Sequence, residues 1–437
     1  MRPEDVAAAA LAALLPALVP ALAPGYAGGT MPADQRLREF FRGHPALGKR
    51  ERMQIADWVF DVLRNLRLYR EVARRARVAR GDAGGSAGGE SNVRDESRVQ
   101  DESGVRDEAR ELIEVARAAA GQLPGRGASG DADRGPIAQI AQIAAQLPDE
   151  VRFSMPDWLW ERLRAAHGER AGAIARSLLQ ASPIDLRVNL LVGKTDALRR
   201  KLSERGIEAI PIDGVPTGLR LNGRPALEKL DLFERGWFEF QDAGSQRIVD
   251  SCDIRRGQLV VDFCAGAGGK TLAMAARMRN MGKVLAFDTG EERLSRLMPR
   301  AARAGASIVT TLRISGLSDA RLARYRGRAD VVLVDAPCSG TGTLRRSPDI
   351  KWRLSARSVS LHLREQQAIL AAASTLVKPG GRLVYATCSL LREENQDQVD
   401  HFNGSTTGFE LTHVEHWLPD VGQTSGFFVA KWVLKGS

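Results

Sequence analysis

The chain has 437 residues, which is enough for two or three domains of ordinary size. Apolar residues make up 43% of it, a fraction that permits a buried core and excludes a wholly disordered protein. The formal net charge of +10 favours an anionic partner, and RNA or DNA is the first that we expect. The alternative is a basic protein whose charge serves solubility alone.

The chain contains four cysteines, none in a C-x-x-C pair, and its six histidines do not accompany them at the spacing of metal ligands. We therefore expect no disulfide framework and no metal, and a reducing cytoplasm fits best. The apolar stretch Val6–Gly25 resembles a secretory leader, but the acids Glu4 and Asp5 precede it and Pro16 interrupts it. We interpret this stretch as a packed helix. No other stretch is long and apolar enough for a membrane span.

Helical periodicity marks the first domain, which we place at residues 1–80. In residues 50–69, apolar side chains recur on one helix face and charged side chains lie opposite, as in a helix packed in a core. A helical connector is expected over 136–182, where an amphipathic segment begins at Asp157 and follows Pro156, a residue typical of helix entry.

The composition changes to Gly, Ser, Asp, Glu and Arg over residues 81–135. A six-residue motif begins at Val93, Val99 and Val105. A period of six fits neither a helix nor a heptad, and the apolar content is too low to offset the entropy of ordering. We expect this insertion to be disordered apart from a short helix over Glu108–Gly121.

Short apolar strands alternate with helices in the rest of the chain. Residues 183–228 show strand, helix and two further strand patterns, which we interpret as a small α/β (RRM-like) module that positions RNA. Five strands follow in residues 229–437, in QLVVDF, KVLAFD, SIVTTL, DVVLVD and RLVYAT. This rhythm predicts a doubly wound parallel sheet, whose ligands lie at the carboxyl ends of the strands.

The glycine-rich segment VVDFCAGAGGKT, Val260–Thr271, follows the first of these strands and fits neither phosphate-binding motif. A Walker loop needs glycine at position 264, which is a cysteine, and the dinucleotide pattern fails at Thr271. The next strand ends in Asp288, where an acid can accept hydrogen bonds from both hydroxyls of a ribose. Together these features favour S-adenosylmethionine over a dinucleotide. The alternative is a glycine-rich turn that serves packing alone.

Two thiols lie at the ends of two later strands. The segment DAPCSGTG places Asp335 and Cys338 at the carboxyl edge, and ATCS places Cys388 there. A buried cysteine is often only a small hydrophobic residue, but two of them beside a predicted methyl donor suit attack on cytosine. A thiolate that adds to C6 makes C5 a nucleophile toward the methyl group. Asp335 can assist by hydrogen-bonding the ring near N3 if it is protonated in a dry pocket.

Four blocks of the sequence resemble the RNA 5-methylcytosine methyltransferases of the Sun type: GWFEFQDAGSQ, DFCAGAGGKT, DAPCSGTGTLRRSPDIKW and YATCSLLREENQDQV. The likeness runs from about Met155 to the C-terminus, and it implies a Rossmann-like S-adenosylmethionine-dependent methyltransferase. It also implies that Cys388 is the nucleophile, that Cys338 helps to release the product, and that Asp335 lies between methyl donor and base. The implied cofactor-binding residues are Cys264, Ala265, Gly266, Ala267, Gly268, Gly269, Lys270, Asp288 and Asp335.

The likeness is nearest to a member whose N-terminal helical domain resembles the antitermination factor NusB, and residues 49–66 fit that domain's pattern. The chain departs from the family at Ala267, where proline is usual. It also has no acid before Asp319 in LRISGLSD, where the family commonly has an Asp that contacts the adenine amine. We leave the adenine contact unassigned and expect weaker cofactor binding.

The predicted function is transfer of a methyl group from S-adenosylmethionine to C5 of a cytosine in RNA. The expected substrate is 16S ribosomal RNA or a small-subunit precursor, and we expect a monomer without metal or membrane attachment. A basic segment is expected to follow phosphates or else to form a solvated loop: Arg345, Arg346, Lys351 and Arg353. Two alternatives remain, a transfer-RNA methyltransferase and a ribosome-assembly factor that binds RNA without methylating it. Affinity for S-adenosylmethionine distinguishes the assembly factor from both enzymes.

Overall fold

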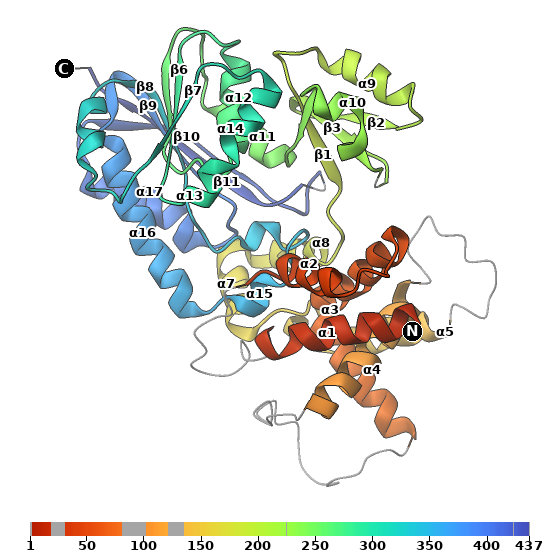
Figure 1. The fold of residues 1–437 in the computed structure, drawn as a ribbon. Coiled ribbons are helices and arrows are strands. Elements are labelled where there is room, and N and C mark those ends of the chain that lie inside the picture. Colours follow the sequence, from red (N-terminus) through yellow and green to blue (C-terminus); the bar gives the residue numbers. More distant parts are fainter. Residues whose placement is uncertain are drawn as a thin grey trace. The chain divides into compact units, whose positions relative to one another are not determined.

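The computed structural model describes residues 2–18, 31–80, 102–120, 135–223, 225–422 and 424–436. The chain forms two compact units (Figure 1). The helical unit comprises residues 1–180 and 343–358, and the α/β unit comprises residues 181–342 and 359–437. Within the described ranges, no helix is both long and apolar enough to cross a bilayer.

Amphipathic helices build the helical unit, and their apolar stripes form its core. The helices are α1 (Pro3–Leu18), α2 (Ala33–Gly43), α3 (Lys49–Arg80), α4 (Glu102–Ala120), α5 (Gly135–Ala145), α6 (Asp149–Arg152), α7 (Asp157–His167), η3 (Gly168–Arg170), α8 (Ala171–Leu178) and α15 (Ile350–Arg353). The apolar N-terminal stretch is helical over α1, where Leu11, Leu14 and Leu15 are buried. The helical N-terminal region therefore agrees with the NusB-like character that the sequence indicated.

Helix α4 lies inside the insertion for which the sequence predicted disorder. It begins at Glu102, earlier than the short helix expected from Glu108, and it packs against α1 and α3. Four residues at helical spacing form its buried stripe: Ala109, Leu112, Ile113 and Ala116. The start of the helix was missed because its first residues overlap the six-residue motif. The predicted short helix is confirmed for residues 108–120, whereas the prediction of disorder is wrong for residues 102–107. Residues 81–101 and 121–134 lie outside the described residues.

Residues 343–358 fold with the helical unit, although the sequence placed them in the sheet domain. The indole N–H of Trp352 and the Nζ of Lys351 each donate a hydrogen bond of 2.7 Å to a carbonyl oxygen of α3. Arg345 and Lys351 are each 2% exposed, so the expectation that they follow RNA phosphates is wrong. Long basic side chains can be buried when their apolar stems pack and their polar ends find acceptors.

Seven strands form the main sheet of the α/β unit, in the order β10-β11-β9-β8-β5-β6-β7. Their bounds are β5 (Leu259–Asp262), β6 (Lys283–Asp288), β7 (Val309–Arg313), β8 (Ala329–Asp335), β9 (Val377–Thr387), β10 (Phe409–Trp417) and β11 (Phe427–Leu434). Strands β5 to β9 pair in parallel, and β10 and β11 extend the sheet in antiparallel fashion. The predicted doubly wound sheet is confirmed. The strand order reverses beside β5, where sheets of this kind bind their ligands.

Helices cover both faces of this sheet. They are α11 (Ala243–Ser251), α12 (Gly269–Arg277), α13 (Glu291–Ser295), α14 (Leu297–Ala304), α16 (Ala356–Ser374) and α17 (Gln396–Ser405), with the short helices η5 (Ala320–Tyr325), η6 (Thr341–Thr343) and η7 (Arg392–Glu394). Successive residues of a strand point to opposite faces. Val260 therefore packs in one core with Leu272 of α12, and Val261 packs in the other with Leu370 of α16. Figure 1 shows α16 and α17 on the opposite side of the sheet from α11 and α12.

A smaller sheet has four antiparallel strands in the order β2-β3-β1-β4. Its elements are β1 (Ile184–Val188), α9 (Thr195–Ser203), β2 (Ala209–Ile212), β3 (Val215–Leu221), η4 (Leu227–Lys229), α10 (Asp231–Glu234) and β4 (Phe238–Phe240). The predicted small module is present, but β4 lies beyond residue 228, where the sequence ended it. Phe238 of β4 pairs with Val188 of β1. A strand of three residues is too short for its alternation to be recognised.

Replacing Leu112 with Ala should lower the free energy of unfolding of the helical unit by roughly 2–5 kcal/mol, because a buried leucine leaves a cavity. Urea unfolding measures the loss. Asp107→Ala, on the exposed face of the same helix, is the control and should change that free energy by less than about 0.5 kcal/mol. Equal unfolding curves for the two variants would contradict a core position for α4.

Candidate active site

The glycine-rich loop connects β5 to α12 at the place where the strand order reverses. Gly266 and Gly268 have φ angles of 55° and 85°, which favour glycine. A Cβ on Gly268 would lie 2.4 Å from Cγ of Leu297, whereas a Cβ on Gly266 would meet no atom within 4 Å. Gly268 therefore permits close packing against α14, and Gly266 leaves open space where the chain turns toward the N-terminus of α12. A small molecule can approach the backbone there.

The first two residues of the loop support it from the core side. Cys264 packs on the apolar cluster that includes Phe263 and Phe287. Burial raises the pKa of the Cys264 thiol well above its ordinary value. Ala265 is also buried, and its N–H donates to the carbonyl oxygen of Phe287 at 2.9 Å. The side chain of Cys264 and the backbone of Ala265 therefore hold the loop on the sheet.

Asp288, at the end of β6, fastens the loop to the neighbouring strand. One carboxylate oxygen accepts the N–H of Gly266 at 2.7 Å. The other accepts the N–H of Gly290 at 2.7 Å and a guanidinium N–H of Arg293 at 2.6 Å. The Asp288 side chain is 5% exposed. The residue predicted to bind a ribose thus also fixes the loop. Its Oδ2 has one protein donor and a lone pair left for a ligand, whereas its Oδ1 already accepts two donors.

Lys270 and Asp335 form an ion pair at the carboxyl edge, with Nζ 2.5 Å from Oδ2. Burial lowers the pKa of Lys270, but the charge and the hydrogen bond of Asp335 outweigh this effect and raise it above its ordinary value. The Asp335 side chain is 31% exposed. An ion pair requires the ionised carboxylate, and this exposure does not describe a dry pocket. The suggestion of a protonated Asp335 therefore does not fit this arrangement.

The structure brings together the two thiols that the sequence placed at strand ends. Sγ of Cys338 lies 3.4 Å from Sγ of Cys388. Their strands β8 and β9 are parallel neighbours, with Asp335 opposite Ala386. The hydrogen bond to Cys388, burial and the charges of Cys388 and Glu394 raise the pKa of the Cys338 thiol well above its ordinary value. Two sulfurs at this distance can share one proton.

Asp262, the last residue of β5, is a buried acid beneath the loop. It is 1% exposed, and its Oδ2 accepts the hydroxyl of Thr271 at 2.7 Å. Burial raises the pKa of Asp262 to about 7, and the charges of Asp335 and Asp288 act in the same direction, while the Thr271 hydrogen bond opposes them. No role for Asp262 was predicted from the sequence. Its position could have indicated one, because Asp262 ends the strand that leads into the glycine-rich loop.

The segment after β7, where no acid was found for the adenine contact, is organised by Asp319. Its carboxylate accepts the N–H of Ser315 and the N–H of Arg321, each at 2.9 Å. The hydrogen bonds of Arg321 and Ser315 hold the pKa of Asp319 far below its usual range. Asp319 is therefore engaged in fixing its own loop and capping η5, and the adenine contact stays unassigned.

Glu394 was also missed, although the block YATCSLLREENQDQV contains it. Its carboxylate is fully buried and accepts the N–H of Ser339 at 2.8 Å and the hydroxyl of Ser389 at 2.5 Å. These serines directly follow Cys338 and Cys388. The available signal was an acid close behind the second cysteine, but two adjacent glutamates among polar residues look like a solvated turn.

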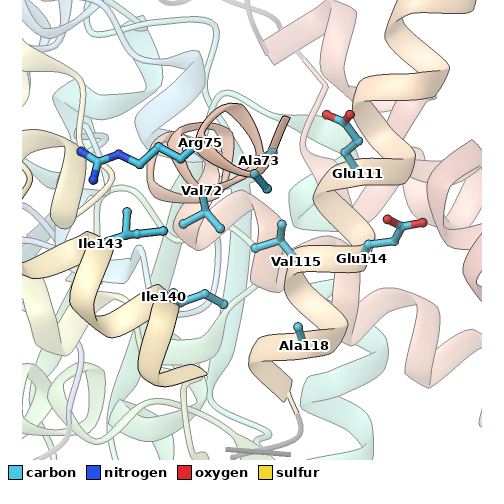
Figure 2. A pocket seen from close by; sticks show the side chains of 10 residues that line it. Val72, Ala73, Arg75, Glu111, Glu114, Val115, Ala118, Ile140 and Ile143 are labelled. Carbon is cyan, nitrogen blue, oxygen red and sulfur yellow. The ribbon is translucent and has the colours of Figure 1, made fainter. Parts of the chain in front are cut away.

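A pocket of about 340 Å³ lies in the helical unit between α3, α4 and α5. Figure 2 shows Val72, Val115, Ile140 and Ile143 around it. Glu111 and Glu114 also line it, on α4. Arg75 of α3 is a further part of the lining. The lining is thus mainly apolar with two acids and one basic side chain, and it contains none of the residues predicted for chemistry. Among the residues that the structure describes, no group of three or more His, Cys, Asp or Glu side chains could hold a metal ion.

The raised pKa of Asp262 predicts a pH-dependent stability. Because folding raises the pKa of Asp262, the fold is more stable at a pH where this acid is protonated. That stability is lost as the pH rises from the ordinary pKa of an aspartic acid to about 7. Asp262→Asn stays neutral and keeps an acceptor for Thr271. Its melting temperature should therefore exceed that of the wild type by a margin that grows from pH 4 to pH 7 and is constant above, as thermal melts at each pH will show.

Asp196→Asn, at an 80% exposed side chain of the same unit, is the control and should give no such trend. If the melting temperature of Asp262→Asn exceeds that of the wild type by the same amount at pH 4 and at pH 8, Asp262 is not a buried acid that is neutral below pH 7.

The chain matches two family models. The model described as 16S rRNA methyltransferase RsmB/F matches residues 251–432, and that of an RsmF/B-like ferredoxin-like domain matches residues 155–228. Ribosomal RNA small subunit methyltransferase B of Citrobacter koseri is 35% identical over 305 residues, which are 68% of this chain and 70% of the relative. This is also the member whose motifs the sequence resembled most.

Two solved structures show the same fold. The crystal structure of PH0851 is similar over 99% of both chains, with a TM-score of 0.72 and 24% identity. The structure of NSun6 from Pyrococcus horikoshii with SFG covers 64% of this chain and 99% of its own, with a TM-score of 0.58 and 22% identity. These two structures establish the fold alone, whereas the family match and the relative of 35% identity establish the family. The chain belongs to the RsmB/F family of 16S rRNA methyltransferases, and its cofactor is S-adenosylmethionine.

Proposed function

We propose that this methyltransferase modifies C5 of a cytosine in small-subunit ribosomal RNA through a covalent bond between Cys388 and C6 of the base. The observation that carries the proposal is the 3.4 Å separation of the Cys338 and Cys388 sulfurs at the carboxyl edge of the sheet. C5 of cytosine is too electron-poor to attack a sulfonium methyl group until a nucleophile has added to C6. Methylation of a ring nitrogen or a ribose oxygen needs no such thiol.

The loop from Cys264 to Lys270 suits S-adenosylmethionine. The open space at Gly266 admits a ligand next to the backbone, and the positive end of α12 favours the carboxylate of the methionine part. Asp288 would accept the ribose hydroxyls. NSun6, with the same fold, has been solved with SFG, an analogue of this cofactor. When bound, S-adenosylmethionine supplies an electrophilic methyl group.

The chain's own residues account for the remaining steps. Cys388 uses an electron pair of its thiolate to form the bond to C6, and the ring electrons gathered at C5 then form the bond to the methyl group. A base then takes the C5 proton, and the electrons of the broken C–H bond restore the double bond and expel the Cys388 sulfur with its electron pair. The charge of Cys388 is one of the causes that raise the pKa of Lys270, after its Asp335 partner, so Lys270 is the cation proposed to assist the attack. The Asp335 carboxylate can accept a hydrogen bond from the exocyclic amine, and Cys338 acts in release.

The first test separates the two thiols. Cys388→Ala cannot form the adduct, so it should be inactive and should trap no RNA. Cys338→Ala should attack and methylate but stall before release, and should accumulate a covalent protein–RNA species. Denaturing gels of each variant after incubation with small-subunit RNA and S-adenosylmethionine show this species as a slower band.

Cys252→Ala, at a buried thiol that bonds to the carbonyl oxygen of Ile248, is the control and should release its product. A trapped species from Cys388→Ala and none from Cys338→Ala would exchange the two roles. Full activity in both variants without any trapped species would exclude a thiol mechanism.

The second test concerns Asp288. A charged hydrogen bond contributes about 1.5–3 kcal/mol, so Asp288→Ala should weaken S-adenosylhomocysteine binding at least about tenfold in calorimetry. Because Asp288 also holds the loop, the 2′-deoxyribose analogue is measured as well. The wild type should prefer the ribose form, and the variant should lose that preference. A preference that survives in Asp288→Ala would contradict a direct contact with the ribose.

Ribosomal RNA is proposed as the substrate rather than transfer RNA because the family model and the relative of 35% identity are both described by small-subunit ribosomal RNA. An assembly factor without methylation would not need the pair of close thiols. We retain a monomer and a cytoplasmic location as predictions.

A further inference from the structure

The buried carboxylate of Glu394 joins the loops that carry the two cysteines. It accepts the N–H and the hydroxyl of Ser339, which follows Cys338, and the hydroxyl of Ser389, which follows Cys388. The two loops leave different strands, β8 and β9. One side chain thus fixes the positions of both cysteines relative to each other.

Glu394 is itself held in place by neighbouring elements. The amide of Gln366 on α16 donates to its Oε1 at 3.2 Å and to the carbonyl oxygen of Pro337 at 2.9 Å. The hydroxyl of Tyr385 donates to the backbone carbonyl oxygen of Glu394 at 2.7 Å. An ionised carboxylate only accepts hydrogen bonds, and donors converge on this one as a buried charge requires. The contacts of Glu394 therefore suit an ionised, negatively charged carboxylate.

The two sulfurs experience opposite charges. The negative charge of Glu394 is one of the causes, after the Cys388 hydrogen bond and burial, that raise the pKa of Cys338. The positive charge of Lys270 interacts with Cys388. Since the sulfurs are 3.4 Å apart, the negative charge of Glu394 favours a proton shared between them on Cys338.

We propose that Glu394 is a positioning residue that keeps this proton on Cys338, so that Cys338 donates an S–H hydrogen bond and Cys388 is the sulfur that attacks. This inference rests on the proposed function, in which Cys388 forms the bond to the base. Glu394 acts through the two cysteines and touches neither RNA nor cofactor. It would thereby explain why two adjacent thiols have separate tasks.

The test measures the reactivity of each thiol against pH in the full chain, with neither RNA nor S-adenosylmethionine present. Iodoacetamide labels thiolates, and mass spectrometry of the peptides resolves Cys338 from Cys388. In the wild type, Cys388 should be labelled faster than Cys338 at pH 7. In Glu394→Gln, the midpoint of Cys338 labelling should fall by about half a pH unit or more, because the anion is gone.

Two further variants separate charge from loop geometry. Glu393→Gln, at the adjacent half-buried position, makes the same change of net charge and should leave the midpoint of Cys338 where it is. Glu394→Asp keeps the anion on a shorter side chain, so it should keep the midpoint of Cys338 near the wild-type value even if the loops loosen and activity falls.

Faster labelling of Cys338 than of Cys388 in the wild type would overturn the inference, and this measurement needs no variant to fold. An unchanged Cys338 midpoint in folded Glu394→Gln would overturn it as well. Because the labelling experiment contains no RNA, its result does not depend on whether the proposed methylation mechanism is correct. A fully active Cys388→Ala would refute the adduct, while the labelling order would still report on Glu394.

Discussion

The parallel pairing of β8 with β9 is the constraint on which the chemistry of this protein depends. Asp335 lies opposite Ala386 in that pairing, so the segments that follow the two strands leave the sheet side by side. Cys338 and Cys388 then come within 3.4 Å although fifty residues separate them in the sequence. Gly342 maintains this approach beyond the cysteines, because its N–H donates to the carbonyl oxygen of Cys388 at 2.9 Å. A shift of register by one residue would turn one thiol to the other face.

The same edge of the sheet organises charge. The strand order reverses beside β5, so the loop after β5 meets the ends of both β6 and β8. Asp288 fastens that loop from one side, and Asp335 pairs with its Lys270 on the other. Glu394 carries a further negative charge behind Cys338. Each charged group thus has a defined partner, and the arrangement distinguishes two thiols that are equivalent by residue type.

Strand ends and motifs were predictable from the sequence because they obey short-range rules. The parallel strands are short apolar runs, and the residues after them must gather at one edge. This was sufficient to bring Cys338, Cys388, Asp335 and Asp288 together. It was also sufficient to exclude phosphate-binding loops. The partners of these residues were not predictable, since they depend on which loops meet in space. Asp288 holds Gly266, and Glu394 holds both cysteine loops.

The errors arose where residue type misleads about burial. Lys351 and Arg345 look like a phosphate-binding segment, yet the structure buries both in the helical unit, and burial lowers the pKa of Lys351 well below its ordinary value. Residues 102–107, the start of helix α4, were assigned to the disordered insertion because the polar six-residue motif runs into them. In both cases, contacts with distant helices decide the outcome, and a local pattern does not contain them.

The most direct test of the account is the identity of the methylated nucleoside. Small-subunit ribosomal RNA is incubated with the enzyme and S-adenosylmethionine carrying a labelled methyl group, and is then digested and separated into nucleosides. The account predicts that the label appears in 5-methylcytidine with the wild type and is lost with Cys388→Ala. Label in another nucleoside, or equal 5-methylcytidine from both proteins, would contradict it.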